Sequence, residues 1–250
     1  VTPNTPRDIR STNQVVSVGY AVVGTSDKGV GIGHTITHNR TRANAVSVGR
    51  DITNSAAADG VGIGRDLTIK NGVNIGYSLT SQSGTVIGKS STVNNGTAIG
   101  ESSTASKNSS MSIGHTAISS RGGTSVGHNV RTDLTGVAVG KNIASTSRGG
   151  VAVGQNVQAT YSGVAIGRSS RSDGGAAVVV GSNLDGSNFR FTNVLVGSNQ
   201  KITNGVALGT NNSITGRRQS VVVGIGNSGG SSRGGANVTV GVSNSGLNGS

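Results

Sequence analysis

The hydrophobic positions of this chain recur at a short and nearly constant interval. Between Gly29 and Ile69, triplets that end in Gly occupy residues 31–33, 47–49 and 62–64, and a Val precedes each of them. The same motif, closed by what we call the anchor glycine, occurs 17 times at spacings of 12 to 17 residues. The anchors are Gly19, Gly33, Gly49, Gly64, Gly76, Gly88, Gly100, Gly114, Gly127, Gly140, Gly154, Gly167, Gly181, Gly197, Gly209, Gly224 and Gly241. Self-similarity of this kind is typical of a solenoid, in which each repeat packs on its neighbours.

The positions before each anchor form columns of constant character. The residue one before the anchor is always aliphatic, and the residue three before it is Val in 13 of 17 copies. These two aliphatic columns are two residues apart, so they share one face of a strand. The residue between them, the small column, is Gly, Ser or Ala in 11 of 17 copies and points the other way. We therefore predict that the aliphatic columns fill a dry interior and that the small column faces outward.

The positions after the anchor predict a turn and a second strand. The residue two after the anchor is Ser, Thr, Asn or Asp in 15 of 17 copies, and such side chains favour turns. A further aliphatic residue often follows, at Ile36, Ile52, Leu67, Leu79, Val130, Ile143 and Val157. The unit is therefore strand, glycine corner, strand, loop, which is too short for a helix pair or a propeller blade. Structural turn glycines, where a Cβ would obstruct the chain, include Gly33, Gly49, Gly64, Gly100, Gly140, Gly154 and Gly167.

Stacking these units gives an all-β, parallel β-roll solenoid of about 17 short coils, with neighbouring strands about 4.8 Å apart. A strand face in contact with water would carry longer polar side chains than the small column does. Small residues let another backbone approach closely, so we predict that the small column packs against other copies of the chain. The alternative is that small residues merely suit a tight coil.

The composition supports thin β layers and excludes several classes. The 250 residues include 43 Gly but no Cys and no Trp, and the apolar residues are mainly Val, Ile and Ala. Charged residues are 12% of the chain, so the signature of disorder is not met. Without Cys there are no disulfides and no thiolate metal sites. No apolar run has the length of a membrane span. No signal peptide is visible and the chain starts at Val1 rather than Met, so we read it as a mature or excised fragment.

Several copies of the motif resemble a known repeat. GVAVGKNI (136–143), GVAVGQNV (150–157), GVAIGRSS (163–170) and GTAIGESS (96–103) resemble the YadA-like head repeat of trimeric autotransporter adhesins. The resemblance implies a left-handed parallel β-roll, a homotrimer and an adhesive role at a cell surface. The resemblance spans the head β-roll (15–245). Residues 1–14 hold both prolines and are read as an N-terminal arm, with a disordered end as the alternative, and residues 246–250 form a C-terminal tail. A membrane anchor, neck or stalk would lie outside these residues, and a viral or phage fibre that binds a host receptor is the alternative.

The net charge of +12 favours polyanionic partners, although the alternative is that it serves solubility alone. The residue directly after the anchor is basic or His in 8 of 17 copies. A candidate polyanion-binding edge follows, formed by Arg50, Arg65, Lys89, Lys141 and Arg168. Asp51 and Asp66 are expected to offset two of these charges, and the alternative interpretation is a solvated turn position.

The coil between Gly181 and Gly197 contains both phenylalanines of the chain. Phe189, Arg190 and Phe191 are a candidate protruding contact, because aromatic residues and Arg are enriched at binding hot spots. The alternative is that the two rings fill a local widening of the core or a contact between chains.

No enzyme motif is complete. GTVIGKS (84–90) is one residue short of a phosphate-binding loop, and three of the four His residues share a repeat column rather than converging on a metal. We predict a non-enzymatic protein without cofactors, located on the cell surface or, alternatively, on a virion. Expected partners are further copies of the chain and an extracellular matrix protein, glycan or anionic surface. Specific nucleic-acid binding is not expected, because neither aromatic platforms nor a recognition helix are visible.

Overall fold

The protein is a parallel β-solenoid in the computed structural model. The structure describes residues 10–11, 15–24, 28–39, 44–55, 59–107, 109–145, 148–173, 176–186, 193–215, 219–229 and 237–245. The regular elements of these residues are 24 strands, with no helix among them. The chain forms two compact units, residues 1–121 (unit 1) and 122–250 (unit 2).

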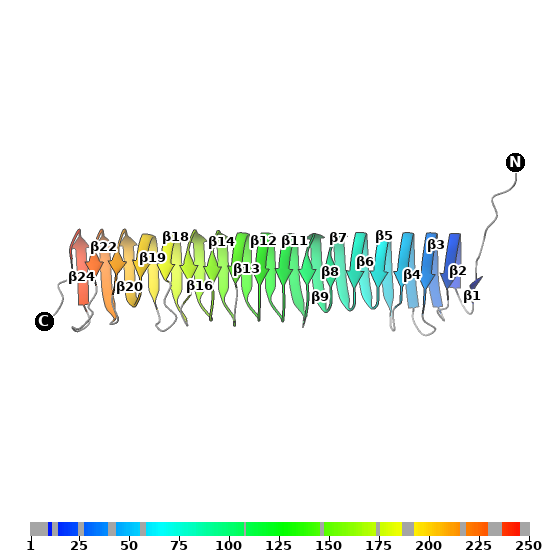
Figure 1. Cartoon of the computed structure of the whole chain (residues 1–250), viewed down its shortest axis with the longest axis horizontal. Helices are drawn as coiled ribbons and strands as arrows, with labels where there is room; N and C mark the ends of the chain where they lie inside the picture. Colours follow the sequence, from blue (N-terminus) through cyan, green and yellow to red (C-terminus); the bar gives the residue numbers. More distant parts are fainter. Residues whose placement is uncertain are drawn as a thin grey trace, which may run out of the picture. The chain divides into compact units, whose positions relative to one another are not determined.

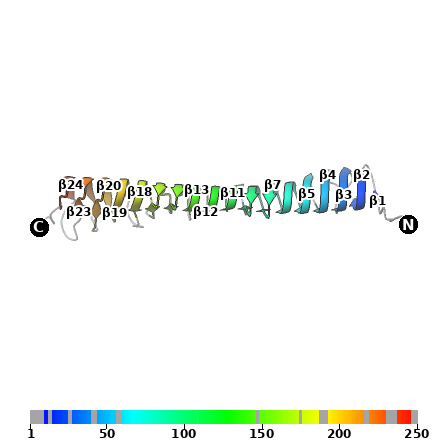
Figure 2. The same ribbon diagram turned by 90° about the horizontal axis from the view of Figure 1, so that it is seen from above.

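In unit 1, each strand pairs in parallel with the strand of the next coil, and both views show β2 to β7 side by side (Figures 1 and 2). Gly33 pairs with Gly49 and Ile36 with Ile52, so equivalent positions of successive repeats are in register. The strands are β1 (Arg10–Ser11), β2 (Val15–Gly24), β3 (Lys28–His38), β4 (Asn44–Asn54), β5 (Gly60–Ile69), β6 (Gly72–Ser81), β7 (Gly84–Lys89), β8 (Thr92–Val93), β9 (Gly96–Glu101), β10 (Thr104–Ala105) and β11 (Ser110–Ser119).

Unit 2 repeats the same arrangement. Its strands are β12 (Thr124–Thr132), β13 (Val137–Ser145), β14 (Val151–Gln155), β15 (Gln158–Ala159), β16 (Val164–Arg168), β17 (Arg171–Ser172), β18 (Val178–Gly186), β19 (Val194–Ile202), β20 (Gly205–Thr210), β21 (Ser213–Ile214), β22 (Ser220–Ile225), β23 (Ser228–Gly229) and β24 (Asn237–Val242). Gly127 pairs with Gly140 and Gly140 with Gly154, all in parallel ladders. In each unit the predicted anchor glycines pair only with one another, which confirms the predicted repeat and its register.

The corner of each coil uses two left-handed backbone conformations. The anchor glycines have φ between +121° and +142°, and the non-glycine residues two positions later have φ between +51° and +55°. A Cβ on Gly33 would overlap with the carbonyl oxygen of Gly49, which explains why glycine recurs there. Asn, Asp and Ser suit the second position, because their side chains bond locally to the backbone. The prediction of a glycine corner followed by a turn residue is therefore confirmed.

The predicted orientation of the first strand is wrong. The small column lies inside the solenoid, where Ala98, Ala138 and Ala152 are completely buried. The aliphatic columns face outward, and Ile63, for example, is 42% exposed. The residues that share a face were predicted correctly, but the inward and outward faces are exchanged.

The narrow interior explains this exchange. The second strand also contributes inward side chains, three and five positions after the anchor, so little space remains for the first strand. A Cβ on Gly62 would lie 2.5 Å from Ile69 Cδ1, so the large residue of this pair is on the second strand. In a later coil the large residue is on the first strand, where Val179 faces Gly186. Because protein interiors are close-packed, a facing pair typically holds no more than one large residue, although Leu195 and Ile202 are both buried in one coil.

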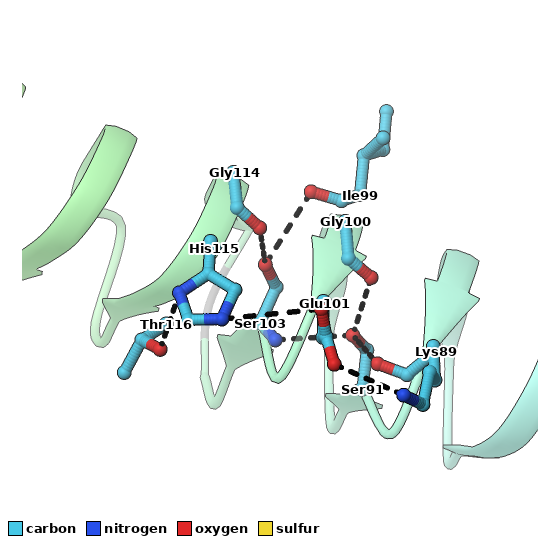
Figure 3. Close-up of polar contacts among 9 residues, drawn as sticks. All are labelled: Lys89, Ser91, Ile99, Gly100, Glu101, Ser103, Gly114, His115 and Thr116. Atoms are coloured by element: carbon cyan, nitrogen blue, oxygen red, sulfur yellow. Dashed lines mark hydrogen bonds and ion pairs between the residues drawn. The ribbon is translucent and has the colours of Figure 1, made fainter.

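Buried polar side chains connect successive coils where the second strand lacks an aliphatic residue. Ser91 Oγ donates to the carbonyl oxygen of Gly100 at 3.0 Å and accepts the backbone N–H of Ser103 at 3.0 Å (Figure 3). In later coils of unit 2 the same position is amidic, and Asn212 Nδ2 donates to the carbonyl oxygen of Gly224 at 2.9 Å. These bonds satisfy polar groups that burial would otherwise destabilise.

The ends of the chain are described only in part. Arg10 and Ser11 of the predicted N-terminal arm pair with Val23 and Gly24. The rest of the arm, the tail 246–250 and the candidate contact Phe189, Arg190 and Phe191 lie outside the described residues.

Candidate functional site

Both units present an exposed aliphatic face, which we define as the side chains one and three positions before each anchor. None of its members is buried among the described residues. Those more than a third exposed are Val16, Val18, Ile32, Val46, Ile63, Ile75 and Met111 in unit 1 and Ile166, Val196, Leu208, Val221, Val238 and Val240 in unit 2. Charged side chains are absent from these two columns in the sequence.

The register makes each aliphatic face continuous within its unit. In unit 1, Val46 pairs with Val61 and Val61 with Val73, so their side chains follow one another from coil to coil. Large contiguous apolar patches are uncommon on monomeric proteins and mark interaction surfaces. Val and Ile are also stiff at χ1, so they lose little conformational entropy when a partner covers them.

In unit 1, the residues directly after the anchors form an edge column that combines aromatic and charged side chains. The rings of Tyr20 and His34 stack with centroids 4.8 Å apart and planes 16° apart. The guanidinium of Arg65 lies over the ring of Tyr77, 4.5 Å from its centroid. A hydrogen bond with Tyr77, together with the nearby Asp66 carboxylate, raises the pKa of Arg65.

Each of the three predicted cations of unit 1 has a carboxylate partner. Arg50 Nε lies 3.2 Å from Asp51 Oδ2, and Arg65 Nε lies 3.2 Å from Asp66 Oδ2. Lys89 Nζ lies 3.1 Å from Glu101 Oε1, as Figure 3 shows. These pairs are exposed and therefore weak, but they reduce the positive charge of this edge.

The edge column of unit 2 is more open. Lys141 pairs in register with Gln155, and Gln155 with Arg168, so an uncharged residue separates the two cations. Within the described part of unit 2, neither cation has a carboxylate within ion-pair distance. The five residues of the predicted polyanion edge therefore fall into a compensated set in unit 1 and an uncompensated pair in unit 2.

Two structural features escaped the sequence analysis. One is the outward aliphatic face, discussed above, and the other is a row of exposed amides two positions after the anchors of unit 2. Asn129 Nδ2 donates to Asn142 Oδ1 at 3.1 Å, and Asn142 Nδ2 donates to Asn156 Oδ1 at 3.1 Å. The signal for this row was the recurrence of Asn at one repeat position in three successive copies.

Searches for metal sites and membrane spans cover the described residues only. In that part of the chain, no three His, Asp or Glu side chains converge in a way that could hold a metal ion. The same residues include no helix with the length and apolar character needed to cross a membrane.

The chain was also compared with known proteins. Comparison with protein-family models, curated proteins and solved structures found no match to this sequence or its fold.

Proposed function

We propose that the chain is a non-enzymatic, adhesive and structural module that assembles with two further copies of itself through its aliphatic faces. The observation that carries this proposal is the outward orientation of the Val and Ile columns in both units. A lone solenoid in water could take the same strand preference from Thr, so aliphatic side chains at this position of successive coils favour a partner surface.

The size of the aliphatic face supports stable association. Full burial of one Val or Ile side chain is worth about 1.5–3 kcal/mol, so a half-exposed one retains about half of that. Seven side chains of the aliphatic face in unit 1 and six in unit 2 are more than a third exposed. Their combined contribution is comparable to or greater than the cost of association, about 4–15 kcal/mol for each partner.

The proposed role is attachment. Repeated coils on three chains offer many equivalent weak sites, and multivalency converts weak contacts into firm binding. The solenoid fold is compatible with the resemblance of the motif to heads of trimeric autotransporter adhesins. We therefore propose display at a cell surface, with an extracellular matrix protein, a glycan or an anionic surface as the ligand.

Lysine substitutions on the aliphatic face test the proposal. Ile166→Lys and Val151→Lys place a charge in the aliphatic columns, whereas Gln155→Lys places the same charge in the edge column as a matched control. We expect light scattering to give a trimer for the native chain and for Gln155→Lys, and a smaller species for the double variant. Retention on immobilised matrix should fall with the loss of the trimer. A native chain that is monomeric at micromolar concentration would contradict the proposal.

A further inference from the structure

A groove crosses the second strands of three successive coils in unit 2. Its volume is about 430 Å³. The lining residues that matter here are Asn129, Asn142, Asn156, Arg131, Ala144 and Gln158. All six come from unit 2, so the groove is complete within one compact unit.

One small residue creates the groove. Arg131, Ala144 and Gln158 occupy the same position of successive coils, because Arg131 pairs with Ala144 and Ala144 with Gln158. A methyl group thus stands between two long polar side chains, and the gap above Ala144 is open. A longer side chain at Ala144 would close it.

The amide row forms one side of the groove with a fixed geometry. Asn129, Asn142 and Asn156 have φ of +53°, +53° and +54°, and each donates to or accepts from its neighbour in the row. The row uses one N–H of the donating amides, and an amide group has two. Aligned donors and acceptors at the coil spacing suit the adjacent hydroxyl groups of a saccharide.

The charge of the groove favours an acidic ligand. Arg131 is 61% exposed at its side chain and meets Asp133 through one nitrogen at 3.5 Å. Its guanidinium carries five N–H donors in a fork that matches a carboxylate, so one long contact leaves binding capacity. Lys141 adds a second cation directly before Asn142 in the sequence.

We propose that this groove binds an acidic glycan, with the carboxylate of a uronic acid on Arg131 and the sugar hydroxyls on the amide row. A single-stranded nucleic acid would require aromatic side chains for base stacking, and none lines the groove. The inference rests on the proposed adhesive function and names its ligand class. The groove uses positions after the anchor and association uses positions before it, so the groove stays open in the assembly.

The test uses the full chain and a hyaluronan hexasaccharide, measured by calorimetry. The matched probe is the methyl ester of the same hexasaccharide, which lacks the negative charges. We expect the acid to bind, and the ester to bind more weakly by a factor of about ten or more, because a charge-assisted hydrogen bond is lost. Equal binding of acid and ester, or no binding of the acid, would overturn the proposal.

Two variants locate the site. Arg131→Gln removes the cation, and Ala144→Gln fills the groove with a residue that the fold already accepts at Gln158 in the same column. Arg131→Gln should weaken acid binding about tenfold or more, the cost of one charged hydrogen bond. Ala144→Gln should weaken it by occupying the groove, whereas Ser213→Gln on the same column but outside the groove should leave binding unchanged. Unchanged binding in Arg131→Gln, or a polyglutamate peptide that binds in place of the acid, counts against the site. Light scattering of the same samples separates this inference from self-association, since an intact trimer without binding contradicts only the groove.

Discussion

At the residue scale, the coil depends on a glycine whose missing Cβ makes room for the next coil. The anchors have φ above +120°, and for almost all of them an added Cβ would overlap with a backbone carbonyl of the following coil. Two separate penalties therefore act on any substitution: backbone strain, and a steric overlap that no side-chain rotation can relieve. The residue two positions after the anchor carries only the strain of a left-handed φ, which Asn, Asp and Ser tolerate at moderate cost.

Gly140→Ala and Gly149→Ala compare a site that carries both penalties with one that carries only mild backbone strain, since their φ values are +136° and +80°. Both glycines have positive φ, but a Cβ on Gly140 would overlap with the carbonyl oxygen of Gly154, whereas a Cβ on Gly149 meets only Ser162 Oγ at 3.8 Å. We expect Gly149→Ala to cost about 1 kcal/mol from strain alone, and Gly140→Ala to cost clearly more. Thermal melting followed by circular dichroism measures both. Equal losses of stability would show that the close approach of the coils is unimportant.

His38 gives unit 1 a pH-dependent contribution to stability. The imidazole is 1% exposed, and its Nε2 lies 2.9 Å from Ser47 Oγ. Burial lowers the pKa of His38 below its usual value of 6.5, so in this range the unfolded chain binds more protons than the folded chain. The contribution is therefore complete above pH 6.5 and is lost progressively as the pH falls further. Melting temperatures between pH 7.5 and pH 5.5 should show this decline.

His38→Asn is the matched control for the pH dependence. Asn54 occupies the same register position in the next coil, where it is buried and donates to the carbonyl oxygen of Gly60 at 3.0 Å. The variant should fold and should show a flatter pH profile than the native chain. A profile as steep as that of the native chain would show that His38 is not the source of the pH dependence.

At the scale of the element, the sequence pattern predicted the strands and their register but not the inward face. Alternation with a period of two shows which residues share a face, and a column of Val favours a buried position. The decisive information lies in the second strand, where residues five positions after the anchor compete for the same interior. Gly62 opposite Ile69 and Val179 opposite Gly186 reveal this competition only once the two strands are known to face each other.

A double-mutant cycle tests this pairing of sizes. Gly62→Val alone overpacks the interior, at a cost of about 1–3 kcal/mol, and Ile69→Gly alone leaves a cavity, at a cost of about 2–5 kcal/mol or more. Together they recreate the combination of Val179, Leu184 and Gly186, because Leu67 already corresponds to Leu184. The double variant should be more stable than the sum predicts by about 0.5–3 kcal/mol. Simple additivity in chemical denaturation would mean that the two positions do not share space.

The candidate site shows the same limit of sequence reasoning. The column of cations is visible as a repeat position, and Asp51 and Asp66 could be foreseen as partners of Arg50 and Arg65 because they are adjacent in the sequence. Glu101 lies in the next coil, in the same column as Lys89, so only an alignment of successive coils reveals this pair. Grooves depend on such neighbours between coils, which a single repeat does not reveal.

At the scale of the whole molecule, the proposed function depends on what covers the aliphatic faces. The proposed assembly places the Val and Ile columns of each unit against other chains and leaves the edge column and the groove in contact with solvent. Function then follows from repetition, because many equivalent sites are presented on one trimer. Both units carry the same face, so each contributes to the proposed assembly.

Thiol accessibility tests whether the aliphatic faces are covered in a trimer, because the native chain has no Cys. Ile166→Cys reports on the aliphatic face, and Arg168→Cys reports on the edge column two residues away. If three chains associate, light scattering should give three times the chain mass of 24.6 kDa. Under those conditions the thiol at position 168 should react quickly and the thiol at position 166 slowly, with the slow reaction becoming fast when dilution releases monomers. A monomeric chain whose thiol at position 166 reacts as quickly as the one at position 168 would contradict the proposed trimer.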